Sequence, residues 1–201
     1  MDEELAKQII DELGQMVKKL AKQNGLLWFY QMHQLAVIKS AESLLAIYPK
    51  ANHPLVIIAC WLHDVAQYFA KDSNFDKVKK NHHLASAKLA KEILADYKIG
   101  EAEKEQIVNC VLNHRNLEGC QPKTLEEKIV AVADTLSHFE GIFYLTYFKF
   151  HPKHSLEEMA ENDLAKLQRD WRDLGLLTKA RVLAKPRYVI LKNMLQDFQK
   201  N

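Results

Sequence analysis

Two aspartates lie beside apolar stretches of the sequence, where an ionised carboxylate needs a partner. Asp64 follows the apolar run of residues 55–62 after one histidine, and Asp134 follows the apolar run of residues 129–133. Burying an unpaired carboxylate costs several kcal/mol. No Lys or Arg lies one helical turn from Asp64, and the nearest basic residue upstream of Asp134, Lys128, lies off its helix face. A multivalent cation shared with imidazoles is the simplest partner for both carboxylates.

The histidines of the chain stand where they could supply those imidazoles. The chain has nine histidines, and His63 directly precedes Asp64. His33 lies inside a predicted helix, His82 and His83 open another, and His114 ends a third. Their placement at helix ends and within helices is the most informative feature of the sequence.

The elements that must position these side chains are helices. Six glycines and five prolines in 201 residues are about half of the usual share of about 12%, which favours an all-α fold over one with many turns. Apolar spacing, caps and breakers predict no strand. They predict helices over residues 2–24, 29–47, 55–67, 82–97, 101–115 and from 124 towards 150, a polar loop over 71–80, and two helices between 156 and 198 that divide near Gly175 or Pro186.

Composition excludes several classes of protein. The net charge of +2 is too small to indicate nucleic-acid binding by bulk electrostatics. The three cysteines form no C-x-x-C pair, so a disulfide framework and a zinc finger are both disfavoured and a cytoplasmic location is expected. The longest apolar run, residues 55–62, is far shorter than the ~20 residues of a membrane-spanning helix. Glycine-rich phosphate loops, G-x-S-x-G and H-E-x-x-H are absent from the sequence.

The order of His33, then His63-Asp64, then Asp134 resembles the H…HD…D signature of the HD-domain superfamily of metal-dependent phosphohydrolases. The segments around them, Ala59 to Val65 and Val132 to Asp134, resemble the same family. The resemblance covers about residues 26–150. It implies an all-α, HD-domain-like helical bundle over 26–150, with an N-terminal amphipathic helix (1–25) packed on it and a C-terminal helical extension (151–201).

The resemblance also implies a set of metal ligands. His33, His63, Asp64 and Asp134 would hold one ion. Asp64 would bridge to a second ion or to the substrate phosphate, together with His82 and His114. We therefore expect catalytic roles for Asp64, His82 and His114, and His83 competes with His82 for its place. Imidazole and carboxylate ligands suit Mn, Fe, Ni, Co or Zn, and the carboxylates also admit Mg, as one or two divalent ions.

These residues predict a phosphohydrolase that acts on a nucleotide or another small phosphorylated metabolite through a metal-activated hydroxide. Arg115 and Lys80 stand beside proposed ligands and are candidates for holding the substrate phosphate. The expected partner is this small phosphorylated substrate. A homodimer is a further expectation, whereas a membrane is not expected as a partner and nucleic acid is disfavoured.

Two departures from the family pattern support a second interpretation. Gln67 stands where members that cleave cyclic dinucleotides carry a Lys, and no Arg follows His33. The alternative is a non-catalytic, metal-containing HD protein that binds or senses a nucleotide. An oxygenase built on a di-iron site of the same fold is a third interpretation.

Overall fold

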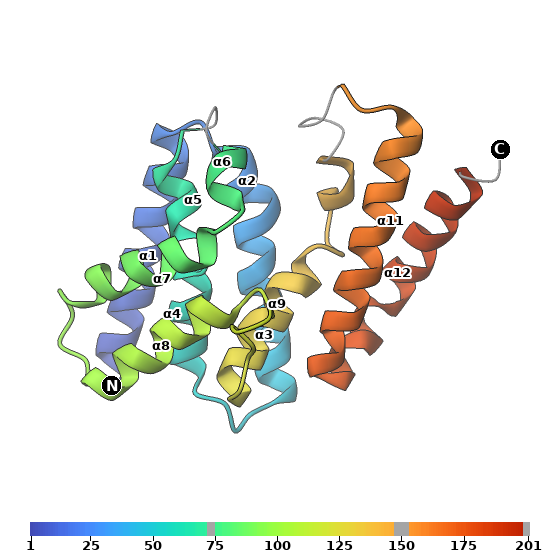
Figure 1. Ribbon diagram of the computed structural model, residues 1–201. Helices are drawn as coiled ribbons and strands as arrows, with labels where there is room; N and C mark the ends of the chain where they lie inside the picture. The colour runs from blue at the N-terminus through green and yellow to red at the C-terminus, as the bar shows by residue number, and fades with distance from the viewer. Residues whose placement is uncertain (72–74, 147–152, 199–201) are drawn as a thin grey trace. The chain divides into compact units, whose positions relative to one another are not determined.

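The computed structural model describes residues 1–71, 75–146 and 153–198. Its elements are helices, and within these described residues no strand forms, apart from an isolated bridge between Leu117 and Cys120. The all-α prediction is therefore confirmed (Figure 1). No helix among the described residues is both long enough and apolar enough to cross a membrane.

The chain divides into two compact units, Met1–Asp134 and Thr135–Asn201. The first unit contains α1 (Glu3–Gln23), α2 (Leu27–Phe29), a π-helical turn (Tyr30–Gln34), α3 (Leu35–Ile47), α4 (His53–Leu62), α5 (Val65–Phe69), α6 (Phe75–Lys79), α7 (His82–Leu94), α8 (Glu101–Asn113) and most of α9 (Leu125–Ser137). The second contains a 3-10 turn (Phe143–Leu145), α11 (Leu156–Asp173), another 3-10 turn (Leu174–Leu176) and α12 (Thr178–Phe198). The predicted domain boundary at 150/151 lies outside the described residues.

Helix α4 is the centre of the first unit. Every residue from Leu55 to Leu62 is buried, as expected for a helix that is apolar on all sides. It begins where the Asn52 side chain accepts a hydrogen bond from the amide of Leu55 at 3.3 Å, with Pro54 in the first turn. Helices α1, α3 and α8 pack around it.

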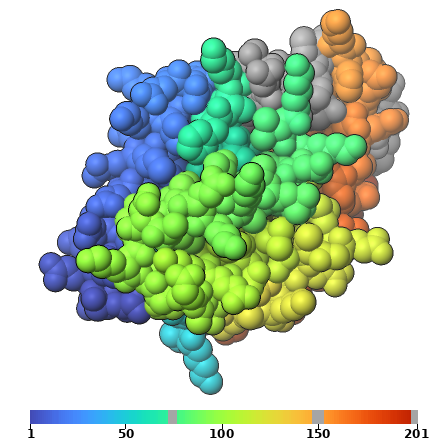
Figure 2. All heavy atoms as spheres, turned by 60° about the vertical axis from the view of Figure 1, so that its left-hand side comes forward, coloured from blue at the N-terminus to red at the C-terminus, as the bar shows by residue number. Residues whose placement is uncertain are grey.

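Close packing of α1 on α4 depends on a glycine. A Cβ atom at Gly14 would lie 3.2 Å from Cζ2 of Trp61, so the absence of a side chain lets the two helices approach. The other side of this unit is covered by α7 and α8, which pack against each other and form a continuous green surface in Figure 2.

The predicted helix over 55–67 is interrupted at the two residues that matter most. Helix α4 ends at Leu62 and α5 begins at Val65, with His63 and Asp64 between them. Side chains occupy the carbonyl of Cys60, which accepts from Nδ1 of His63 and from Nε2 of Gln34, both at 2.8 Å. Because these bonds satisfy a carbonyl near the end of the helix, the main chain can turn there and aim both side chains inwards.

Other boundaries also differ from the predictions. A π-helical turn interrupts the predicted 29–47 helix, and α6 forms within the predicted 71–80 loop. Helix α9 ends at Ser137 instead of continuing, because Gly141 adopts φ 54° and turns the chain before the 3-10 turn; residues 147–150 of that expected helix lie outside the described residues. Gly175 does divide the C-terminal region, whereas Pro186 lies inside α12.

The second unit is built around the hairpin of α11 and α12. Helix α11 begins with a capping box, in which Ser155 accepts from the amide of Glu158 and the Glu158 carboxylate accepts from the amide of Ser155. The two helices pack against each other, and the ring of Trp171 stacks on that of Tyr188 with 4.1 Å between centroids.

Candidate metal centre

Six sequence-predicted ligands converge within the first unit. They come from the π-helical turn (His33), the break between α4 and α5 (His63 and Asp64), the start of α7 (His82), the residue after α8 (His114) and the last turns of α9 (Asp134). The four histidines and Asp64 are buried, and the side chain of Asp134 is 16% exposed. The geometry therefore brings together residues that are as much as 101 positions apart in sequence.

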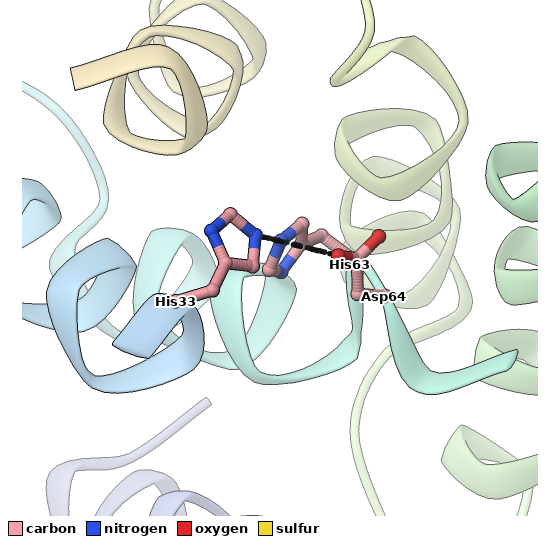
Figure 3. Close-up of side chains that lie close together, drawn as sticks. All are labelled: His33, His63 and Asp64. Carbon is pink, nitrogen blue, oxygen red and sulfur yellow. Dashed lines mark hydrogen bonds and ion pairs between the residues drawn. The ribbon is translucent and has the colours of Figure 1, made fainter. Parts of the chain in front are cut away.

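The first group of ligand atoms gathers around Nε2 of His33. This atom lies 3.3 Å from Nε2 of His63, from Oδ2 of Asp64 and from Oδ1 of Asp134. Nε2 of His63 lies 3.4 Å from Oδ2 of Asp64 and 3.9 Å from Oδ1 of Asp134. Figure 3 shows the rings of His33 and His63 turned towards the Asp64 carboxylate. Such spacings match neighbouring ligands of one ion held at about 2.0–2.2 Å.

The second group uses the other oxygen of Asp64. Oδ1 of Asp64 lies 2.9 Å from Nε2 of His82 and 3.8 Å from Nε2 of His114. The two imidazole nitrogens lie 2.9 Å from each other. One carboxylate thus contributes one oxygen to each group, which is the arrangement of a bridging ligand between two ions.

Hydrogen bonds behind three of the rings fix which nitrogen faces the centre. Nδ1 of His63, His82 and His114 each lies 2.6–2.8 Å from the carbonyl oxygen three residues earlier, in Cys60, Lys79 and Val111. A carbonyl oxygen only accepts, so each Nδ1 carries a proton, and in the neutral ring each Nε2 presents a lone pair inwards. Metal-ligating histidines are oriented by this kind of second bond.

This donor set requires a cation. Facing Nε2 lone pairs of His82 and His114 would repel at 2.9 Å unless a proton or a metal ion lies between them. Oδ1 of Asp64 is buried and forms no hydrogen bond in the structure, although it lies against the same two nitrogens. A buried oxygen without a hydrogen bond lowers the stability of the folded protein. A divalent cation would satisfy all three atoms, so these residues fit a metal.

The charges of the aspartates and histidines shift each other's pKa values. Burial lowers the pKa of His33, but Asp134 and Asp64 outweigh it and raise that pKa to about 9. Burial raises the pKa of Asp64, but the charges of His63 and His82 outweigh it and hold that pKa well below its ordinary value. Burial and the neighbouring imidazoles lower the pKa of His114 to about 3. In the absence of metal, a proton on His33 takes the place of the first cation.

Not every predicted residue joins the two groups. His83 is buried at the start of α7 with its Nδ1 unpartnered, and among the described residues the tight groups contain His82 in its place. Arg115 donates from a guanidinium nitrogen to the carbonyl of Lys80 at 2.6 Å. The Lys80 side chain is exposed. The roles of Arg115 and Lys80 in phosphate binding stay predictions.

Three supporting residues carried no signal in the sequence. The ring of Phe29 stacks on His33 with 4.9 Å between centroids. Gln34 donates to the carbonyl at the end of α4, and Oγ of Ser86 accepts from the amide of Ala66 at 3.2 Å, which ties α5 to α7. Gln34 and Ser86 act across 26 and 20 residues, a separation that helix periodicity does not encode, whereas Phe29 stands four residues before His33.

Comparison with known proteins gives one finding. The model of one protein family, described as the HD domain, matches residues 30–138, more than half of the chain. No curated protein and no solved structure matches the chain. The matched range contains all six residues of the two groups. The prediction of an HD-type helical bundle is thereby confirmed.

Proposed function

Because the chain belongs to the HD-domain family, a superfamily of metal-dependent hydrolases, we propose that it hydrolyses a phosphoester of a nucleotide or another small phosphorylated metabolite. The observation that carries the proposal is the position of Asp64, whose two carboxylate oxygens each face a separate group of imidazoles. Two ions sharing one carboxylate are typical of sites that cleave phosphoesters.

The chain's own residues take distinct roles in this proposal. His33, His63, Asp64 and Asp134 would hold the first ion, and Asp64, His82 and His114 the second. When bound, such ions lower the pKa of water and neutralise charge on a phosphoryl group. The backbone carbonyls behind His63, His82 and His114 hold the rings in one tautomer. Burial of the ligands keeps bulk water from screening the charges.

Arg115 is the proposed phosphate-binding residue. One of its terminal nitrogens is fixed by the Lys80 carbonyl, and a guanidinium has further N–H groups that suit phosphate oxygens. Its positive charge reaches the site, since burial lowers the pKa of His83 and the charge of Arg115 lowers it further, and the same charge opposes protonation of His82. Lys80 would add a second, more mobile charge for the substrate.

We further propose a cytoplasmic location and a small phosphorylated molecule as the ligand of this site. The three cysteines are free thiols, as expected in a reducing compartment. The native metal is proposed from Mn, Fe, Ni, Co, Zn or Mg, because the ligands are imidazoles and carboxylates with no thiolate among them.

A non-catalytic nucleotide sensor is the second candidate. Its supporting observation is Gln67, which is buried one turn after Asp64 with its Oε1 unpartnered. A neutral amide at this place would bind a ligand without supplying a cationic group. Binding of a nucleotide without turnover would favour this alternative.

The test begins with elemental analysis of the purified protein, followed by hydrolysis of an aryl phosphate and a nucleotide panel in Mn²⁺. Asp64→Asn keeps the size of the side chain but removes the bridging charge, so metal content and activity should both be lost. His53→Gln is the matched control, because this exposed histidine pairs with Glu42, outside the centre. Full metal content in Asp64→Asn would overturn the proposed site. Metal-loaded wild-type protein that binds a nucleotide but hydrolyses nothing would favour the sensor.

A further inference from the structure

One face of α12 carries exposed apolar side chains that the described residues of the second unit do not cover. Val182 and Ile190 expose 73% and 65% of their surface. The opposite face of the same helix is occupied, since Ala184 and Leu195 are buried and Tyr188 stacks on α11. We call the exposed face the α12 stripe; it consists of Val182, Leu183, Pro186, Val189, Ile190 and Met194.

The α12 stripe follows a seven-residue repeat. Equivalent positions are taken by similar residues in two successive heptads. These pairs are Val182 and Val189, Leu183 and Ile190, and Lys185 and Lys192. A seven-residue apolar repeat keeps its residues facing a second helix along the whole contact, and lysines at its edge choose the partner by charge. Individual exposed apolar residues need no explanation, but a continuous stripe with this period indicates a docking surface.

Charge selects the kind of partner. Helix α12 contains five Lys and Arg residues and one Asp, a net charge of +4, whereas the whole chain carries +2. Lys185 and Lys192 recur at equivalent positions along one edge of the stripe. A second copy of the chain packed stripe to stripe in antiparallel fashion would bring these lysines against each other. A partner with acidic residues at this edge would pair with them.

A polar residue on the same face as the α12 stripe separates a protein partner from a membrane. Asn193 is exposed and stands seven residues after Pro186, at the equivalent position of the repeat. A lipid surface would have to bury its amide without hydrogen-bond partners, which is costly. A partner helix can hydrogen-bond an Asn at a seam position, where such a residue fixes register.

We propose that the α12 stripe binds an amphipathic helix of a partner protein. Apolar side chains of that helix would cover Val182, Val189 and Ile190, and its glutamates or aspartates would pair with Lys185 and Lys192. The contact would run from Val182 to Met194, about 18 Å of helix. This surface is independent of the metal centre and of the proposed hydrolysis.

The experiment measures binding of labelled, helix-stabilised peptides to the full chain by fluorescence anisotropy. One peptide carries leucines at the seam and glutamates at the edges, and a second carries lysines at the same edges. The glutamate peptide should bind, and Ile190→Gln should weaken it by about tenfold or more. The double change Lys185→Glu and Lys192→Glu should reverse the preference in favour of the lysine peptide. Leu156→Gln, at an exposed leucine of α11 that is 53% exposed, should leave binding unchanged.

Other occupants of the stripe give different results. Equal binding of both peptides, or no effect of Ile190→Gln in protein with an unchanged circular dichroism spectrum, would overturn the proposal. Self-association that Ile190→Gln abolishes would assign the stripe to a second copy instead. Binding to phosphatidylserine vesicles but to neither peptide would assign it to a membrane. If Ile190→Gln alters folding, the charge reversal decides by itself, because both lysines lie at the edge of the stripe.

Discussion

The proton on His33 makes the stability of the metal-free protein depend on pH in a way that the structure specifies. Its ordinary pKa of 6.5 rises to about 9 in the folded protein, where Asp64 and Asp134 both lie 3.3 Å from Nε2. Because the folded pKa exceeds the unfolded one, the stabilisation is complete below pH 6.5 and is lost as pH rises through about 9. This pKa shift corresponds to about 3 kcal/mol of folding stability. Screening by solvent reduces that figure little, because His33 is buried.

The assay is urea unfolding in the presence of a chelator at several pH values between those two pKa values. The free energy of unfolding of the wild type should fall by about 3 kcal/mol across this window. His82, whose pKa is also raised, would add to the fall in the same direction, so the comparison with His33→Gln isolates one group. That variant should show a fall that is smaller by about 3 kcal/mol. His53→Gln should behave as the wild type.

Metal provides the internal check on this reasoning. With saturating Mn²⁺, His33 is a neutral ligand in the folded protein and a neutral side chain in the unfolded chain above pH 6.5, so its contribution to the pH dependence should vanish. If His33→Gln falls as steeply as the wild type under chelation, the proton does not reside on His33 and the electrostatic account of the centre is wrong.

Three further predictions follow from the geometry. Asp134→Asn should remove the ion of the first group while His114→Gln removes that of the second, so elemental analysis should find one ion per chain in each; loss of both ions in both variants would contradict two separable groups. Asp170→Asn should cost about 3 kcal/mol, because this buried carboxylate accepts from Tyr144 and pairs with Lys166; since its pKa is lowered, the wild-type advantage in urea unfolding should shrink as pH falls. Gly141→Ala should cost about 1 kcal/mol at φ 54° in thermal unfolding, and an unchanged Tm would show that the turn relaxes.

Much of the fold was predictable because its signals are local. Three of these signals each occupy a few adjacent residues: the N-cap at Asn52 followed by Pro54, the apolar run that forms α4, and the cap of α9 at Thr124. The break of the 29–47 helix was not predictable in this way. A π-helical turn places His33 in the centre, and nothing in the apolar period of that segment signals the extra residue.

The resemblance located the six residues of the centre and implied their division into two groups bridged by Asp64. It did not imply which oxygen of Asp64 faces which imidazoles, because the turn after α4 sets that orientation. His82 and His83 are adjacent at a helix start, where periodicity does not separate them. The structure separates them, because Nδ1 of His82 donates to the Lys79 carbonyl and its Nε2 lies 2.9 Å from Nε2 of His114, whereas Nδ1 of His83 has no hydrogen-bond partner among the described residues.

The interruption after α4 shows why a continuous helix was the wrong prediction at this one place. Local propensity gives no signal for a break between Leu62 and Gln67, because this segment contains neither glycine nor proline. A continuous helix would place His63 and Asp64 about 100° apart on its surface, so they would not both face the same ions. The side chains of Gln34 and His63 donate hydrogen bonds to the Cys60 carbonyl instead. The turn that follows brings Oδ2 of Asp64 to 3.4 Å from Nε2 of His63. The break in the helix therefore positions both side chains for the same ions. Substitutions that restore a regular helix here should weaken metal binding before they lower the free energy of unfolding.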